Sequence, residues 1–161
     1  MAVFDEIIDE VKETLSSEPD LRDITVVEFF KDYKRVNPLS NNLITIGIKK
    51  IEVKNKAFGK YLGMVKGNEC FGKTGIISIT INIFVPKNNG GETTAEIFSR
   101  VCNTLMNNSL HEQILSIECG NVEFDKISNA FVLGCIMKLE VIIGQQNDEA
   151  DITSIIVKGG I

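Results

Sequence analysis

The segment from Gly75 to Val85 constrains the fold of this chain more than any other. Isoleucine occupies every second position there and alternates with short polar residues: Ile77, Ile79, Ile81 and Ile83 against Ser78, Thr80 and Asn82. Side chains in a strand point alternately to opposite faces, so this period of two predicts a β-strand with one apolar face. Pro86 ends the strand, and Asn88-Asn89-Gly90-Gly91 follows as a loop. The chain must therefore contain a sheet with an apolar side.

Two other segments show the helical period instead. Near the N-terminus, apolar residues recur at the i, i+3, i+4, i+7 spacing of an amphipathic helix: Phe4, Ile7, Ile8, Val11 and Leu15. Ser16, Ser17 and Pro19 end this helix. A second stripe lies downstream and comprises Ile97, Phe98, Val101, Cys102, Leu105 and Met106. Thr93 or Thr94 is expected to cap that second helix.

Further strands are expected at Leu43–Val53, Tyr61–Val65, Ile114–Phe124 and Ala130–Ile143. The last two flank residues 125–129, a connection of hairpin length. The segment Ile24–Lys34 is β-rich, although a short helix also fits it. The pattern predicts one α+β domain over residues 1–145, with two helices packed on a mostly antiparallel β-sheet. Residues 146–161 form a C-terminal extension that can supply an added strand.

Composition narrows the class of function. The 161 residues carry 17 basic and 22 acidic side chains, a formal net charge of −5, with one His and no Trp. A mildly acidic chain without a basic run is unsuited to wrapping nucleic acid, because phosphate neutralisation requires clustered Lys and Arg. The acidic start argues against an export signal, and no apolar run approaches the roughly 18–20 residues that cross a bilayer. We therefore expect a protein made in a cytoplasm, without a membrane partner.

Few side chains in the sequence are candidates for catalysis or for metal binding. The four cysteines lie far apart, mostly within apolar segments, and are expected to be reduced thiols that fill the core: Cys70, Cys102, Cys119 and Cys135. His111 has no Cys or His at metal-ligand spacing. A nucleophile pair of His111 with Cys102 or Cys119 would need an accessible thiol, whereas the apolar patterns predict buried ones. We expect no enzyme activity, no cofactor and no metal site.

One literal motif requires an explanation. Residues 67–74 match G-x-x-x-x-G-K-[ST], the phosphate-binding P-loop. A working P-loop needs a helix directly after the loop, because the helix N-terminus adds to anion binding. Here the strand Gly75–Val85 follows instead. We interpret the string as a glycine-rich loop that joins two strands, and a nucleotide-binding protein stays as an alternative. The residues that would bind the nucleotide are Gly67, Gly72, Lys73 and Thr74.

The order of short motifs along the chain resembles that of a known family. After an acidic N-terminal helix, and before the final hairpin, the motifs are Asn37-Pro38-Leu39-Ser40, Ile44-Thr45-Ile46-Gly47-Ile48, Tyr61-Leu62-Gly63, Phe84-Val85-Pro86, Gly90-Gly91 and Cys119-Gly120. This layout, over roughly residues 1–145, is similar to that of the tail terminator, or tail-completion, proteins of contractile-tailed phages and prophages of Gram-positive bacteria. Phage-tail-like bacteriocins contain related proteins.

The resemblance implies a structural virion protein that forms a homohexameric ring on the head-proximal end of the tail tube. Such a ring stops polymerisation of tube and sheath and joins the tail to the neck. Its partners are tube, sheath and neck or head–tail joining proteins, and DNA only passes through its lumen. Members of the family are not enzymes and need no cofactor. Another tail component, such as a tube, neck or baseplate subunit, is the alternative.

Two kinds of segment are candidate interfaces for such a ring. The apolar segment 152–157 follows a polar link and can add a strand to a neighbouring subunit, to strands of the sheath, or to its own sheet. The segments 54–74 and 87–92 are expected to be loops that face the ring. The candidate contact residues are Ile152, Ile155, Ile156 and Val157 in the C-terminal segment, and Lys87, Asn88 and Asn89 in the second loop.

Overall fold

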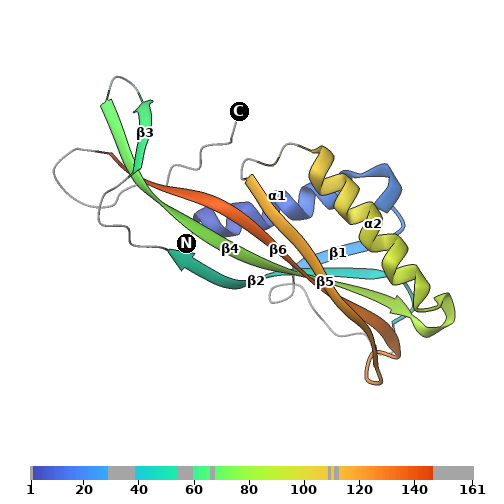
Figure 1. Ribbon diagram of the computed structural model, residues 1–161. Helices are drawn as coiled ribbons and strands as arrows, with labels where there is room; N and C mark the ends of the chain where they lie inside the picture. The colour runs from blue at the N-terminus through green and yellow to red at the C-terminus, as the bar shows by residue number, and fades with distance from the viewer. Residues whose placement is uncertain are drawn as a thin grey trace.

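The computed structural model contains one six-stranded sheet, with α-helices packed against one of its faces (Figure 1). It describes residues 2–28, 39–53, 60–65, 68–108, 110 and 113–146. In these residues the elements are, in chain order, α1 (Ala2–Ser17), η1 (Pro19–Leu21), β1 (Thr25–Glu28), β2 (Leu43–Val53), β3 (Lys60–Val65), β4 (Asn68–Pro86), η2 (Lys87–Asn89), α2 (Glu92–Asn107), β5 (Gln113–Asp125) and β6 (Ala130–Gln146).

The strand order is β1-β2-β4-β6-β5, and β3 pairs with β4 beyond the end of β2. β1 runs parallel to β2, whereas the other described strand pairs are antiparallel. Since β6 follows β4 along its whole length, β2 and β3 lie end to end on the other side of β4. The predicted class is confirmed: two α-helices on a mostly antiparallel sheet, with Thr25–Glu28 as a strand at one edge.

β4 supplies the centre of the core, as the alternation predicts. Its four alternating isoleucines are fully buried, whereas the polar residues between them are only partly buried: Ile77, Ile79, Ile81 and Ile83 against Ser78, Thr80 and Asn82. Each fully buried isoleucine contributes about 1.5–3 kcal/mol of transfer free energy. The strand is longer than predicted, because it begins at Asn68 rather than at Gly75.

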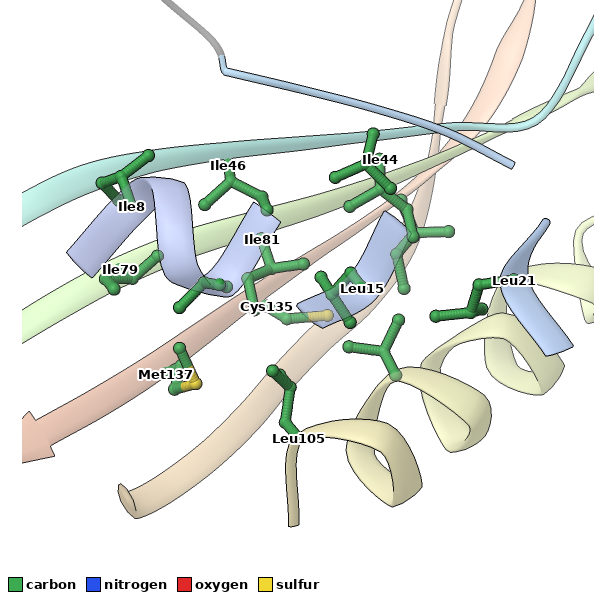
Figure 2. Close-up of a cluster of buried hydrophobic side chains, with 14 of the residues drawn as sticks. Ile8, Leu15, Leu21, Ile44, Ile46, Ile79, Ile81, Leu105, Cys135 and Met137 are labelled. Atoms are coloured by element: carbon green, nitrogen blue, oxygen red, sulfur yellow. The ribbon is translucent and has the colours of Figure 1, made fainter. Parts of the chain in front are cut away.

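Both helices cover the isoleucine side of the sheet, which we call the helix face. The apolar stripes of both helices are buried there: Ile7, Ile8, Val11 and Leu15 of α1, and Ile97, Val101 and Leu105 of α2. Figure 2 shows Ile8 and Leu15 directed at Ile44, Ile46 and Ile81 of the sheet. The opposite side of the sheet carries the intervening polar residues and is called the polar face.

The predicted cap of the second helix is wrong. α2 begins at Glu92, its N-cap is Gly91, and no side chain caps it. The two threonine hydroxyls donate backwards instead, Thr93 Oγ1 to Asn89 O at 2.7 Å and Thr94 Oγ1 to Gly91 O at 2.6 Å. Gly91 lies against Phe131, where an added Cβ would sit 3.3 Å from the ring. Close packing of the loop on β6 therefore fixes the start of this helix, two residues before the threonine signal.

The long strands give the molecule two distinct ends. At one end, η2 lies beside the turn that joins β5 and β6: Lys87 N donates to Asn129 O at 3.1 Å. Asp125 organises that turn, since its carboxylate accepts hydrogen bonds from the amides of Ile127 and Ser128. At the other end, β3 and the start of β4 form a hairpin that projects beyond the helices (Figure 1). We call these the turn end and the hairpin end. They are about 60 Å apart along the 19 residues of β4, at about 3.3 Å per residue.

Candidate assembly interface

The described part of the P-loop-like string, residues 68–74, is a strand rather than a loop, and the helix that phosphate binding requires does not follow it. Gly72, Lys73 and Thr74 lie inside β4, opposite Gly144, Ile143 and Ile142 of β6. Their backbone amides belong to a sheet, and the strand continues for twelve residues after Thr74 to Pro86. The expectation of a loop over residues 67–74 is wrong from Asn68 onward, because these residues form one arm of the β3–β4 hairpin. Gly67 lies outside the described residues.

The cysteines are less uniformly buried than their apolar neighbours predict. Cys135 is buried, Cys102 is half-buried, and Cys119 is exposed on β5, directly opposite Cys135. Burial, with a further contribution from Cys119 and Cys102, raises the pKa of the Cys135 thiol to about 12. Burial also raises the pKa of Cys102, as does the neighbouring Cys119. Cys119 is therefore an accessible thiol, whereas His111, its proposed catalytic partner, lies outside the described residues.

The part of the chain that the structure describes contains neither a group that could hold a metal ion nor a helix that could span a membrane. No group of three or more His, Cys, Asp or Glu side chains in it is arranged to hold a metal ion. None of its helices combines the length and the hydrophobicity of a membrane span.

The candidate contacts at the turn end are accessible. Lys87, Asn88 and Asn89 form η2, and all three are exposed. Asn89 Nδ2 donates to Asn42 Oδ1 at 3.2 Å, so η2 is tied to the start of β2 as well as to the β5–β6 turn. These residues thus form part of a defined surface at one end of the sheet, in a short helical turn rather than in the expected loop.

The remaining interface candidates fall elsewhere. The four apolar residues of the C-terminal segment lie outside the described residues: Ile152, Ile155, Ile156 and Val157. Within the segment 54–74, residues 60–65 and 68–74 are strands rather than a loop. The hairpin that they form lies at the opposite end of β4 from η2. The two segments that were expected to face the ring together therefore belong to opposite ends of the molecule.

Neither edge of the sheet is predicted by the sequence. Large apolar side chains are exposed at both: Leu115, Val122, Phe124 and Ile127 along β5 and its turn, and Ile51 and Val53 on β2. On β2, Gly47–Val53 pairs with β4 alone among the described strands, because β1 covers only Leu43–Ile46. Nothing in the alternation could reveal this exposure, since buried and exposed positions share the same residue types.

The two edges differ in charge. β5 contains three acidic residues and no basic residue: Glu118, Glu123 and Asp125. The half of β2 that no described strand covers on its outer side contains two lysines and one glutamate: Lys49, Lys50 and Glu52. Lys50 lies 3.1 Å from Glu52, and Glu118 lies 3.8 Å from Lys138, with all four side chains exposed to solvent. Each subunit therefore carries an acidic edge and a basic edge, both with exposed apolar side chains.

Neither the models of known protein families nor the curated proteins include a match to the chain. The two sheet edges and the two ends are the features of the described chain that can support association with other subunits.

Proposed function

We propose that this protein is a tail terminator, a structural protein that forms a ring on the head-proximal end of the tube of a contractile phage tail or tail-like particle. The order of its short motifs suggests this function. The structural observation that supports it best is a pair of unlike sheet edges on opposite sides of one subunit, namely β5 and the half of β2 that no described strand covers on its outer side. Two different association surfaces on opposite sides lead to head-to-tail contacts, which close into a ring when the rotation permits.

The two ends of the sheet suit a cap that must contact different structures above and below. The turn end presents the exposed residues of η2, and the hairpin end presents β3 and the first residues of β4. In a ring whose axis follows the strands, one end faces the tail tube and the other faces the neck. Because about 60 Å of strand separates the ends, each contact forms without interfering with the other.

The polar face is suited to a lumen through which DNA passes. On β4 it carries hydroxyl and amide side chains together with Ile76 and Phe84. On β6 it carries Lys138 and Glu140 together with Val132 and Ile136, and on β5 it carries Glu118 and Glu123. Binding to DNA depends on the number of phosphates that Lys and Arg neutralise. A surface with more carboxylates than ammonium groups does not hold phosphates, and so lets the duplex slide.

Capping of growing tubes tests the proposed function. The protein is added at a small molar fraction to polymerising tube subunits, and tube lengths are measured by negative-stain microscopy. We expect shorter tubes with additional density at one end only. Decoration along the tube wall, or a location at the baseplate, would indicate another tail component, and unchanged tube lengths without any bound density would contradict the proposal.

A variant at the turn end locates the contact. Lys87→Glu combined with Asn88→Ala and Asn89→Ala removes the exposed side chains of η2 without touching the core. If the turn end meets the tube, this variant leaves tubes long while its own oligomeric state is unchanged. Glu6→Lys, on the exposed side of α1, is the matched control and should cap normally.

A further inference from the structure

The strand directions at the two edges of the sheet are opposite. β2 is antiparallel to β4, β4 to β6, and β6 to β5, so β5 runs antiparallel to β2 across the sheet. A second copy, related to the first by rotation about an axis along the strands, therefore brings its β2 antiparallel to β5. The junction between copies then has the same orientation as these three pairs within the subunit.

The side chains on the two edges match on both faces. On the helix face, β2 presents Ile51 and Val53, which lie opposite Ile77 and Gly75 of β4. On the same face, β5 presents Ile114, Ile117, Cys119, Val122 and Phe124, since these pair with helix-face residues of β6. Apolar residues would thus meet apolar residues along the helix face of the junction.

On the polar face, β5 carries only acidic charged residues, whereas β2 carries Lys50 together with Glu52, which lies opposite Ile76 of β4. Lys50 of β2 lies opposite Ser78 of β4, a polar-face residue. Glu118 and Glu123 of β5 lie opposite Ile136 and Val132 of β6, on that same face. Their existing ion pairs, Lys50 with Glu52 and Glu118 with Lys138, are exposed pairs that are worth at most about 1 kcal/mol each, so rearrangement costs little.

We propose that β5 of one copy pairs antiparallel with Gly47–Val53 of β2 in the next copy, so that the sheets of successive subunits join into one continuous barrel wall. This inference rests on the proposed function, for which it names the contact between subunits. The polar face lines the interior of this barrel, and α1 and α2 cover its exterior.

Charge selects this contact over a symmetric one. Two β5 edges would bring six acidic side chains together, three from each, without a basic residue in either strand. Two β2 edges would bring four lysines together, and lysine on an edge strand is a common means of preventing such pairing. Unlike edges attract each other, and a contact between unlike surfaces continues from subunit to subunit until the ring closes.

Disulfide trapping tests the pairing, because Cys119 already provides an accessible thiol on the helix face of β5. Cysteine is introduced on the helix face of β2 in three separate variants, Ile48→Cys, Ile51→Cys and Val53→Cys, which together allow for stagger between the strands. After mild oxidation with copper phenanthroline, we expect a ladder of covalent oligomers on non-reducing gels for at least one variant. The same variant combined with Cys119→Ser should give no ladder.

Two results would overturn the pairing. One is the absence of a ladder in all three variants at concentrations where the protein is oligomeric by light scattering. The other is efficient Cys119–Cys119 dimerisation of the wild-type chain, since this would show two β5 edges in contact. Ser99→Cys, on the exposed side of α2, measures the background of random collisions.

Charge reversal provides a second test that leaves the core intact. Lys50→Glu and Glu118→Lys should each weaken self-association by about tenfold or more, because like charges then face each other across the junction. The double variant should recover most of the loss. Glu96→Lys, an equal charge change on the exposed side of α2, should have no effect. Two single variants that associate as tightly as wild type would exclude this junction.

The experiments distinguish a wrong subunit contact from a wrong function. A protein that caps tubes but shows neither ladder nor charge dependence is a terminator with a different subunit contact. A protein that forms the ladder and responds to both charge reversals, yet leaves tube length unchanged, contains the junction without the capping function.

Discussion

The two halves of β2 show how one strand serves both the core and the surface. Residues 43–47 are buried, whereas residues 49–53 are exposed, although both halves pair with β4. Ile46 and Ile51 both point to the helix face, opposite fully buried isoleucines of β4, yet Ile46 is 0% exposed and Ile51 is 40% exposed. Among the described strands, β1 pairs with the first half of β2 only. A partner on the second half would make the two halves alike.

Truncation of the two isoleucines should give the largest contrast. Ile46→Ala is expected to lower the free energy of unfolding by about 2–5 kcal/mol, because it leaves a cavity in a closed core. Ile51→Ala should cost less than about 1 kcal/mol in the monomer, because water already reaches the side chain. Urea denaturation at low protein concentration measures both. Equal losses would mean that the second half of β2 is as well covered as the first.

Cys135 and Cys119 provide a second comparison between a buried and an exposed position, because they lie directly opposite each other on β6 and β5. The pKa of Cys135 is raised by burial to about 12 from an ordinary value of 9.0. The unfolded thiol ionises first as pH rises, so between these values the unfolded state binds fewer protons than the folded state. The contribution of the Cys135 thiol to the free energy of unfolding is therefore complete below pH 9.0 and is lost progressively as the pH rises above 9.0. Thermal unfolding between pH 8 and 10.5 should show this decline.

Alanine variants assign the pH effect to one residue. Cys135→Ala should reduce the loss of stability with rising pH. Cys119→Ala, at the exposed partner position, should change the slope less, because Cys119 contributes less than burial to the raised pKa of Cys135. A slope that responds to Cys119→Ala instead would show that the exposed position is the one shielded from water in solution.

Substitution of Thr45 should give a small change in the free energy of unfolding, and this change should be a gain rather than a loss. It lies in the buried half of β2, and its Oγ1 has no hydrogen-bond partner among the described residues. Valine has nearly the same shape and removes the unpaired hydroxyl, so Thr45→Val should stabilise the protein by about 1 kcal/mol. Thr80→Val, on the same face of β4 but only half-buried, should change the stability by less than about 0.5 kcal/mol. Loss of stability in Thr45→Val would reveal a partner for the hydroxyl, such as a bound water.

Much of the fold is predictable because burial imposes a period on the chain. The isoleucines of β4 and the apolar stripes of α1 and α2 each pack against a continuous apolar surface. The spacing of these residues therefore follows the period of a strand or of a helix. Residues 68–74 do not show a periodic apolar pattern. Gly72 and its neighbours form a strand because they pair with β3 and β6. Local residue types indicate a loop there, and contacts distant in sequence decide otherwise.

The candidate interface was less predictable, for a related reason. Periodicity shows to which face a side chain points, but not whether another element covers it. Cys119 was therefore expected to be a core thiol, although β5 lies at the edge of the sheet and Cys119 is exposed. Lys87, Asn88 and Asn89 were predictable as surface residues because the segment combines polar side chains with two glycines. Which end of the molecule they occupy depends on the length of β4.

The position of β4 between β2 and β6 has a consequence for how the protein folds during synthesis. β2 is made before β4, but β6 begins 44 residues after β4 ends, as the pairing of Pro86 with Ala130 shows. Until the ribosome has produced β6, one side of β4 has no strand to pair with. Residues 75–86 contain no charge and are rich in isoleucine, a composition that favours aggregation. The stretch that organises the finished core is thus the most hazardous part of the nascent chain, and lower growth temperatures should raise the soluble yield.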